Sequence, residues 1–135
     1  MNFRLAAKSF IVKDNNLLII KRRLSDVQKP SIWEIPGGRL ELGEDPFEGL
    51  KRETKEETGL DIEVLNPLSV RYFTRDDNQR ITMIIFYCKP LTSEVKLSDE
   101  HTDFEWVDLN NCKEKLADFF HKDVDAFNKL FLSKK

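Results

Sequence analysis

The chain has 135 residues, with 22 lysines and arginines against 24 aspartates and glutamates, and a net charge of -2. This length predicts one domain over residues 1–135, and the near-neutral charge provides no global field that would attract a nucleic acid polymer or an anionic membrane. No apolar run reaches the roughly 18 residues that span a bilayer. The two cysteines show no metal-binding spacing. These features predict a cytoplasmic protein that has a hydrophobic core and lacks a zinc site.

The first part of the chain predicts short strands around a glycine pair. Aliphatic runs at residues 10–12 and 17–20 flank a turn-prone segment at 14–16, which indicates two antiparallel strands. Residues 33–35 follow as a short strand that ends at the adjacent glycines 37–38. Because glycine adopts backbone conformations closed to other residues, this turn is expected to present its backbone openly.

A capped helix and a hairpin are predicted next. Asp45 followed by proline suits the start of a helix and Gly59 suits the position just past its end, which predicts a helix over residues 46–58. Strand patterns at residues 62–74 and 80–89 are joined by a polar connection typical of a hairpin.

The last part of the chain adds a strand and a helical region. Residues 104–107 form a short strand pattern, and from Asn110 onward apolar residues recur at three- and four-residue spacing. A mixed sheet with helices on both faces is the natural packing for this order of elements. The sequence therefore predicts an α/β fold.

The predicted helix concentrates negative charge. At 100° per residue, Glu53, Glu56 and Glu57 fall on one surface, and their mutual repulsion requires either a cation or full solvation. Hard divalent ions prefer such oxygen ligands. Gly49 lies one turn earlier on this face and would leave room for metals and a phosphate. The same helix also fits a solvated charged face, because basic residues alternate with the carboxylates at Lys51, Arg52 and Lys55.

The spacing of these residues resembles the Nudix box of the MutT-like Nudix hydrolases. That pattern is a glycine, five residues, Glu, seven residues, then Arg-Glu-U-x-Glu-Glu-x-Gly-U, where U is aliphatic. The matching residues, which span 38–60, are Gly38, Glu44, Arg52, Glu53, Glu56, Glu57, Gly59 and Leu60. Thr54 is the one departure; threonine is nearly isosteric with valine, so altered packing is expected there rather than lost chemistry.

The resemblance implies a metal-dependent site in a Nudix-type α/β/α sandwich, in which a mixed sheet lies between helices. Glu53, Glu56 and Glu57 would bind Mg²⁺ or Mn²⁺, with the carbonyl of Gly37 as a further ligand. The ions would neutralise a diphosphate and acidify the attacking water.

The resemblance also assigns supporting roles. Arg52 would orient Glu53, with Glu44 sharing that contact, and Gly59 would complete the structural frame of the box. Family members draw the general base either from the box or from a later carboxylate. In this sequence the later candidate is Glu100, with Asp99 beside it as a competitor; a solvated loop is the alternative.

Substrate contacts are less constrained. Arg22 and Arg23 could clamp phosphate with their forked guanidinium groups, beside Gly38 of the box, although a charged strand end fits equally. A base could stack on an aromatic ring, for which four side chains are eligible, and each of these also fits a core position. They are Phe3, Tyr72, Phe73 and Trp106.

The predicted function is hydrolysis of a diphosphate bond in a nucleotide, with a nucleoside triphosphate giving nucleoside monophosphate and pyrophosphate as the first choice. ADP-ribose and dinucleoside polyphosphates stay open as substrates. A nucleotide sensor that does not cleave its ligand is a second class, but such modules usually lose box carboxylates. An RNA-end hydrolase is disfavoured by the absence of a basic extension. Homodimers are common in the family, although no pattern here marks an interface.

Overall fold

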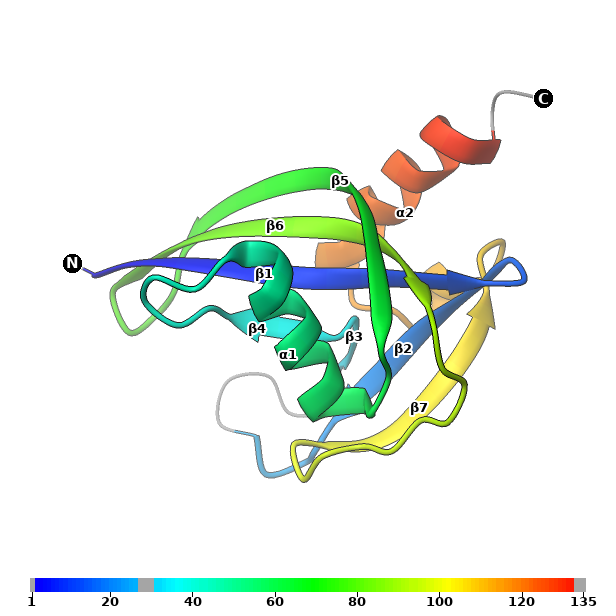
Figure 1. Cartoon of the computed structure of the whole chain (residues 1–135), viewed down its shortest axis with the longest axis horizontal. Coiled ribbons are helices and arrows are strands. Elements are labelled where there is room, and N and C mark those ends of the chain that lie inside the picture. The colour runs from blue at the N-terminus through cyan, green and yellow to red at the C-terminus, as the bar shows by residue number, and fades with distance from the viewer. Residues whose placement is uncertain (1, 27–30, 133–135) are drawn as a thin grey trace.

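The structure is a computed structural model that describes residues 2–26 and 31–132. Its strands and helices follow one another along the chain as shown in Figure 1. The strands are β1 (Asn2–Lys13), β2 (Asn16–Arg22), β3 (Trp33–Glu34), β4 (Gly37–Arg39), β5 (Ile62–Thr74), β6 (Gln79–Pro90) and β7 (His101–Asp108). The helical elements are α1 (Pro46–Thr58), the 3₁₀ turns η1 (Cys112–Glu114) and η2 (Asp118–Phe120), α2 (His121–Phe127) and the π-helical turn η3 (Asn128–Leu132).

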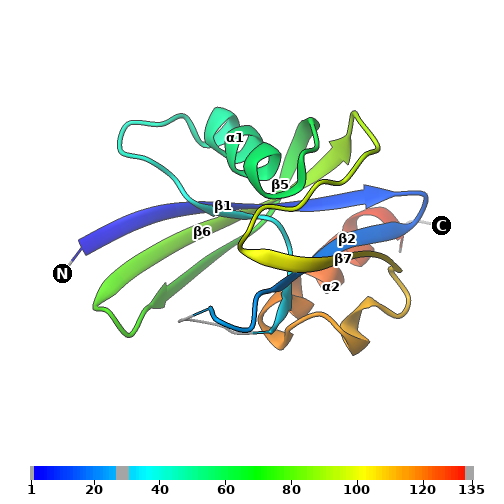
Figure 2. The ribbon, with the colours of Figure 1, turned by 90° about the horizontal axis from the view of Figure 1, so that it is seen from below.

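The strands form a seven-stranded mixed sheet. Its hydrogen-bonded path runs β3-β2-β1-β6-β5, with β4 paired to β1 and β7 paired to β2. β1 and β6 run parallel, whereas the other pairings are antiparallel. Parallel strands need a long crossover, and the connection from β1 to β6 contains α1. Figure 2 shows α1 on one face of the sheet and α2 on the other, which confirms the predicted α/β fold.

The β1–β2 hairpin forms as predicted. Val12 lies opposite Leu17, and Asp14 and Asn15 take positive φ angles of 50° and 64° in the turn. Aspartate and asparagine tolerate this left-handed backbone better than most residues, which suits a two-residue hairpin turn. The turn therefore fixes the register of the two longest buried runs in the chain's first part.

Helix α1 begins and ends where its caps predict. The Asp45 carboxylate accepts a hydrogen bond of 2.8 Å from the Phe47 N–H, and Gly59 closes the helix with a left-handed φ of 76°. Leu50 on its inner side is fully buried and belongs to a core cluster between α1 and the sheet. The other buried members of this cluster are Ala7, Ile11, Leu18, Leu40, Leu60, Ile62, Phe86 and Cys88.

The glycine pair differs from its prediction. Gly37 is buried in β4 and pairs with Lys8, so it does not form an open turn. At its φ of 123°, an added Cβ would lie 2.3 Å from the carbonyl oxygen of Ala7. Glycine is needed because β4 passes tightly against β1, which brings the start of the box directly onto the sheet.

The C-terminal region is only partly helical in the predicted way. The predicted run from Asn110 is broken into η1, η2, α2 and η3, because Leu116 forms a bridge with Trp33 and the Ala117 N–H donates to the Trp33 carbonyl over 2.9 Å. Val124 and Phe127 on α2 are buried in the second core cluster, on the opposite face of the sheet from α1.

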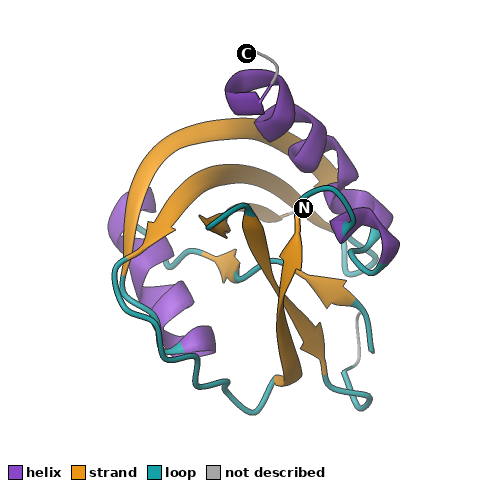
Figure 3. Ribbon diagram, turned by 90° about the vertical axis from the view of Figure 1, so that its right-hand side faces the viewer, coloured by secondary structure: helices purple, strands orange, loops and turns teal. Residues whose placement is uncertain are grey.

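The β5–β6 hairpin forms as predicted and curves around one side of the molecule between the two helices, as Figure 3 shows. Register shifts near Asn66 and Ser69 bend β5. Within the described residues, no helix is both long and apolar enough to cross a membrane.

Candidate active site

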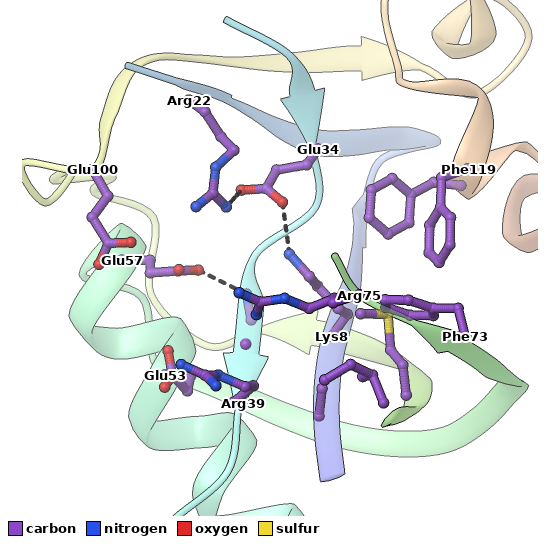
Figure 4. A pocket seen from close by; sticks show the side chains of 16 residues that line it. Lys8, Arg22, Glu34, Arg39, Glu53, Glu57, Phe73, Arg75, Glu100 and Phe119 are labelled. Atoms are coloured by element: carbon purple, nitrogen blue, oxygen red, sulfur yellow. Dashed lines mark hydrogen bonds and ion pairs between the residues drawn. The ribbon is translucent and has the colours of Figure 1, made fainter. Parts of the chain in front are cut away.

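A pocket of about 480 Å³ opens between the C-terminal half of α1, the sheet and the η2 turn. Figure 4 shows carboxylates on one side of it and phenylalanines on the opposite side, with basic side chains between them. The lining residues are Ala6, Lys8, Arg22, Glu34, Gly37, Gly38, Arg39, Glu53, Glu57, Phe73, Arg75, Ile81, Met83, Glu100, Phe119 and Phe120.

The carboxylate wall is built by α1 and the loop before β7. Glu57 is 6% exposed, and one of its oxygens accepts a hydrogen bond of 2.7 Å from the Gly37 N–H. Burial raises the pKa of Glu57 to about 8, and Glu34 and Glu53 add to this rise, while Lys8 and the Gly37 N–H oppose it. A nearby cation would oppose this rise and favour the charged form of the carboxyl.

Glu53 and Glu100 extend the same wall. Burial raises the pKa of Glu53, with Arg52 opposing the rise and Glu56 and Glu100 adding to it. The effect of Glu100 on Glu53 indicates that the two carboxylates lie close enough to interact. The Glu100 backbone is held by the Arg23 N–H, which donates to its carbonyl over 2.9 Å. The loop candidate and the box are therefore brought together.

Glu56 takes a different position from its neighbours. Its side chain is 59% exposed and does not line the pocket, and its oxygens each lie 3.2 Å from Arg52 NH1. Arg52 also contacts Glu53 at 3.4 Å and donates two hydrogen bonds, of 2.7 and 3.0 Å, to the carboxylate of Glu44. These bonds, together with the Glu41 N–H, hold the pKa of Glu44 at about 2.

The space left by Gly49 serves this Arg52–Glu44 contact. An added Cβ at Gly49 would lie 2.6 Å from Leu40 Cδ2 and 2.8 Å from the Glu44 carboxyl carbon. The expectation that Gly49 makes room for a phosphate or metal is therefore wrong. Because Gly49 has no side chain, the Glu44 carboxylate can lie against α1 and accept the hydrogen bonds from Arg52.

Glu34 forms a hub that the sequence pattern did not single out. This carboxylate is 3% exposed and binds Lys8 at 2.8 Å, Arg22 at 2.7 Å and the His101 ring at 2.8 Å. Burial alone would raise its pKa, but Lys8, His101 and Arg22 outweigh burial and hold the pKa well below the ordinary range. Glu34 is therefore charged and fully compensated beneath the pocket. Its neighbours come from β1, β2 and β7, so no local motif could have grouped them.

The predicted phosphate clamp is only partly in place. Arg22 lines the pocket, but its guanidinium is engaged by Glu34 and Asp26, and the Arg23 side chain does not line the pocket. Two basic residues that were not predicted, Arg39 and Arg75, lie between the two walls. Arg39 donates to the neutral amide oxygen of Gln79 at 2.6 Å.

The aromatic wall combines one predicted ring with two others. Phe73 was among the four stacking candidates, and it lines the pocket, whereas Phe3, Tyr72 and Trp106 do not. Phe119 and Phe120 complete the wall from η2, and the Phe73 and Phe119 rings meet edge to face with centroids 5.4 Å apart. The apolar spacing near the C-terminus indicated core positions for Phe119 and Phe120, so neither was predicted to line the pocket.

The departure from the box pattern has a local partner. Thr54 is fully buried, and its hydroxyl lies 3.0 Å from the Ser9 hydroxyl, which also donates to the Pro36 carbonyl at 3.3 Å. The altered packing expected at Thr54 is thus a hydroxyl pair that joins α1 to β1.

The residues present fit a hard divalent cation. Across residues 2–26 and 31–132, no group of three His, Cys, Asp or Glu side chains forms a complete metal cage. Mg²⁺ commonly uses one or two carboxylates and takes its other ligands from water and substrate phosphates. Glu53 and Glu57 supply such oxygen donors on one wall, and Glu57 forms no ion pair with any described residue. The donor set therefore suits a metal that completes its coordination with water or with the phosphates of a substrate.

Comparisons with known proteins identify the family and the fold of the chain. The model of the NUDIX domain matches residues 2–126. The chain is 37% identical over 120 residues to an ADP-ribose pyrophosphatase of Methanocaldococcus jannaschii, covering 88% of this chain and 69% of that protein. It is 33% identical over 110 residues to a MutT-like protein of Streptomyces ambofaciens, covering 82% and 67%. The crystal structure of a MutT protein from Methanosarcina mazei Go1 superposes with a TM-score of 0.85 at 25% identity, covering 99% of this chain and 97% of that one.

The fold and these relatives together define an enzyme of the hydrolase class. The chain belongs to the Nudix hydrolase family, whose members act on nucleoside diphosphate derivatives and generally use divalent metal ions. The resemblance found in the sequence is confirmed.

Proposed function

We propose that this protein hydrolyses a diphosphate bond in a nucleoside triphosphate, with Mg²⁺, to give the nucleoside monophosphate and pyrophosphate. The observation that carries the proposal is the pocket's division into two walls. Carboxylates suited to a divalent ion lie opposite phenylalanines suited to a nucleobase, with basic residues between them. A nucleotide has the same order of parts: an apolar ring, a sugar and a charged phosphate chain.

The metal would be held at the carboxylate wall. Glu53 and Glu57 are the first donors, with the Gly37 carbonyl beside them, and Glu56 would join once its contact with Arg52 is released. Bound Mg²⁺ or Mn²⁺ would neutralise phosphate charge and acidify a water. Arg52 would keep Glu53 oriented through its grip on Glu44.

A carboxylate of the same wall would receive the proton from the attacking water. Glu53 and Glu100 are both candidates, because both line the pocket and Glu100 adds to the raised pKa of Glu53. Arg39 and Arg75 would bind the phosphate chain, and Gly38 would let it approach the backbone. Replacing Glu100 by Gln separates the two candidates, since a general base at Glu100 requires a large fall in kcat.

A triphosphate is preferred because Arg39 forms no ion pair within the part of the chain that the structure describes. The extra charge of a third phosphate would compensate this guanidinium. ADP-ribose is the second candidate, and it is favoured by the 37% identity to the archaeal ADP-ribose pyrophosphatase. That substrate would place a ribose where the triphosphate places its terminal phosphate.

The test is a panel of nucleoside triphosphates, ADP-ribose and dinucleoside polyphosphates, incubated with the protein and Mg²⁺ or with EDTA. Products are separated by chromatography and pyrophosphate is measured. We expect metal-dependent release of pyrophosphate from a triphosphate. Preferred cleavage of ADP-ribose into AMP and ribose phosphate would replace the first candidate by the second, and binding without any product would favour a sensor.

Variants of α1 test whether the measured activity depends on the proposed metal site. Glu53→Gln, Glu56→Gln and Glu57→Gln should each abolish turnover, whereas Glu48→Gln should not. Glu48 is an exposed glutamate of the same helix that pairs with Lys51 at 3.3 Å and lies outside the pocket. Full activity in all three box variants would refute the proposed metal site.

A further inference from the structure

A buried ion pair behind the aromatic wall ties β5 to α2. Asp123 of α2 is fully buried, and its Oδ2 lies 3.2 Å from Arg71 NH1 of β5. Its other oxygen accepts a hydrogen bond from the hydroxyl of Ser69, which is also in β5. Removing one partner of a buried pair leaves an uncompensated charge, so this contact holds the two elements firmly in one arrangement.

The same arginine holds Phe119. Arg71 NH1 donates to the Phe119 carbonyl over 2.7 Å, and the guanidinium carbon lies 4.1 Å from the centre of the Phe119 ring. Phe119 lines the pocket and Arg71 does not, so the guanidinium contacts the ring without being part of the pocket lining. The rings of Phe73 and Phe120 meet the Phe119 ring edge to face, with centroids 5.4 and 5.0 Å away.

We propose that Arg71 and Asp123 are positioning residues for recognition of the nucleobase, which hold the Phe119 ring ready to stack on the base. This inference rests on the proposed function. The planar guanidinium bonds a backbone carbonyl, a carboxylate and a ring face at the same time, which fixes the orientation of Phe119 before the nucleotide arrives. Ordering the ring in advance reduces the entropy lost on binding.

The position of the pair determines which kinetic constant it affects. Arg71 and Asp123 lie outside the pocket, behind the phenylalanines that Figure 4 shows across the cavity from Glu53 and Glu57. Among the described residues, neither forms a hydrogen bond or an ion pair with the carboxylate wall or with the basic residues that would bind phosphate. Loss of the pair should therefore weaken the hold on the base while leaving the reaction at phosphorus intact. An increase in KM with little change in kcat is the expected signature.

The experiment uses Arg71→Lys, Arg71→Gln and Asp123→Asn in the full chain. For each variant, kcat and KM are measured with the nucleoside triphosphate that the unmodified protein hydrolyses best. The inhibition constant of inorganic tripolyphosphate, which has phosphates and no base, is measured in parallel with Mg²⁺. We expect KM to rise about tenfold, in the range of one lost base–aromatic stacking contact, while the tripolyphosphate constant stays within about twofold.

Matched controls come from the same strands and helix. Arg80→Lys alters a second arginine–aromatic contact, in which the guanidinium lies 5.5 Å from the Tyr72 ring centre and 2.6 Å from its hydroxyl, outside the pocket. Asp125→Asn alters an exposed carboxylate of α2 that pairs with Lys113. Both controls should keep the unmodified KM. Phe119→Leu tests the ring directly while leaving Arg71 and Asp123 paired, so it covers the case in which an ion-pair variant fails to fold.

Equilibrium binding of ethenoadenosine triphosphate, followed by fluorescence with Ca²⁺ in place of Mg²⁺, gives a readout that does not need turnover. Weaker binding in Arg71→Lys and Phe119→Leu, with unchanged tripolyphosphate affinity, supports the inference. Unchanged KM and binding in both variants overturns it, and so does an equal loss of affinity for nucleotide and tripolyphosphate. If the unmodified protein hydrolyses no nucleotide, the proposed function fails. The inference about Phe119 can then still be tested, because nucleotide binding by the variants is compared with tripolyphosphate binding and does not need turnover.

Discussion

Glu34 and Glu57 are two buried carboxylates of one pocket, and their surroundings are opposite. Glu34 has Lys8, Arg22 and His101 around it, which hold its pKa well below the ordinary range despite burial. Glu57 has one backbone N–H and no ion pair among the described residues, and burial raises its pKa to about 8. The charge of the first carboxylate is compensated by the protein itself, whereas the raised pKa of the second means that a bound cation would favour its charged form. The difference separates a structural charge from one suited to bind a ligand.

The largest expected effect that tests this difference is on activity. Glu57→Gln should lower kcat/KM by more than about a hundredfold, since even partners one shell away from a metal commonly contribute roughly 10- to 100-fold. Its stability without metal should change little, because the glutamine oxygen can still accept the Gly37 N–H. Steady-state kinetics and thermal unfolding in EDTA measure both quantities. A near-normal kcat/KM in this variant would show that Glu57 does not bind the metal and has a structural role, as Glu34 does.

Glu34→Gln is the converse change in the same pocket. It leaves the buried Lys8 and the partly buried Arg22 without a charged partner at Glu34, and we expect a loss of about 3 to 5 kcal/mol in the free energy of unfolding. Urea unfolding of the metal-free protein measures this loss. A stability loss no larger than that of Glu57→Gln would remove the distinction between the two carboxylates.

The pH dependence of stability gives a smaller effect with opposite signs at the two sites. The folded pKa of Glu57 is about 8 against an ordinary value of 4.5. Between these two values, folded Glu57 keeps a proton that the unfolded chain has released, so metal-free stability should fall as pH rises through this window. The folded pKa of Glu34 is depressed, so its stabilisation is present above 4.5 and is lost as pH falls below that value.

Added metal should change this profile. Mg²⁺ is expected to raise the unfolding midpoint more at about pH 9 than at about pH 6, because the carboxylate must lose its proton to bind the ion. Thermal unfolding across the pH range, with Mg²⁺ and with EDTA, measures the effect. Equal stabilisation at both pH values would show that binding is not coupled to a carboxyl with a raised pKa.

The smallest expected effect concerns Ser9 and Thr54, which lie away from the charged groups. Ser9→Ala leaves the Thr54 hydroxyl without its bond and should cost about 1 to 3 kcal/mol. Thr54→Val leaves Ser9 its bond to the Pro36 carbonyl and should change stability by less than about 1 kcal/mol. The double variant should recover part of the Ser9→Ala loss, whereas additive losses would show that the two hydroxyls are not coupled.

The sequence predicted the parts of the fold that depend on local chemistry. The caps at Asp45 and Gly59 predicted both ends of α1, and aliphatic runs beside turn-prone segments located the first strands. The box spacing identified the family and led to Glu53 and Glu57. These features follow from residues close together in the chain, where helix and strand geometry is known in advance.

Features that depend on contacts between distant segments were missed. The hub at Glu34 joins β1, β2, β3 and β7, and the space at Gly49 is filled by Glu44, so neither is visible in a local pattern. Phe119 has helical apolar spacing typical of a core residue, but the bridge between Leu116 and Trp33 breaks the helix and turns this segment toward the pocket. Tertiary pairing outweighed local periodicity there.

The most direct test of this account is calorimetric titration of the metal-free protein with Mg²⁺ at about pH 7, in buffers of different ionisation enthalpy. If Glu57 is the uncompensated carboxyl that the cation completes, binding should release about one proton per Mg²⁺ ion, and Glu57→Gln should abolish that release together with tight binding. Mg²⁺ binding of equal affinity in both proteins, without proton release, would contradict the account and move the metal away from Glu57.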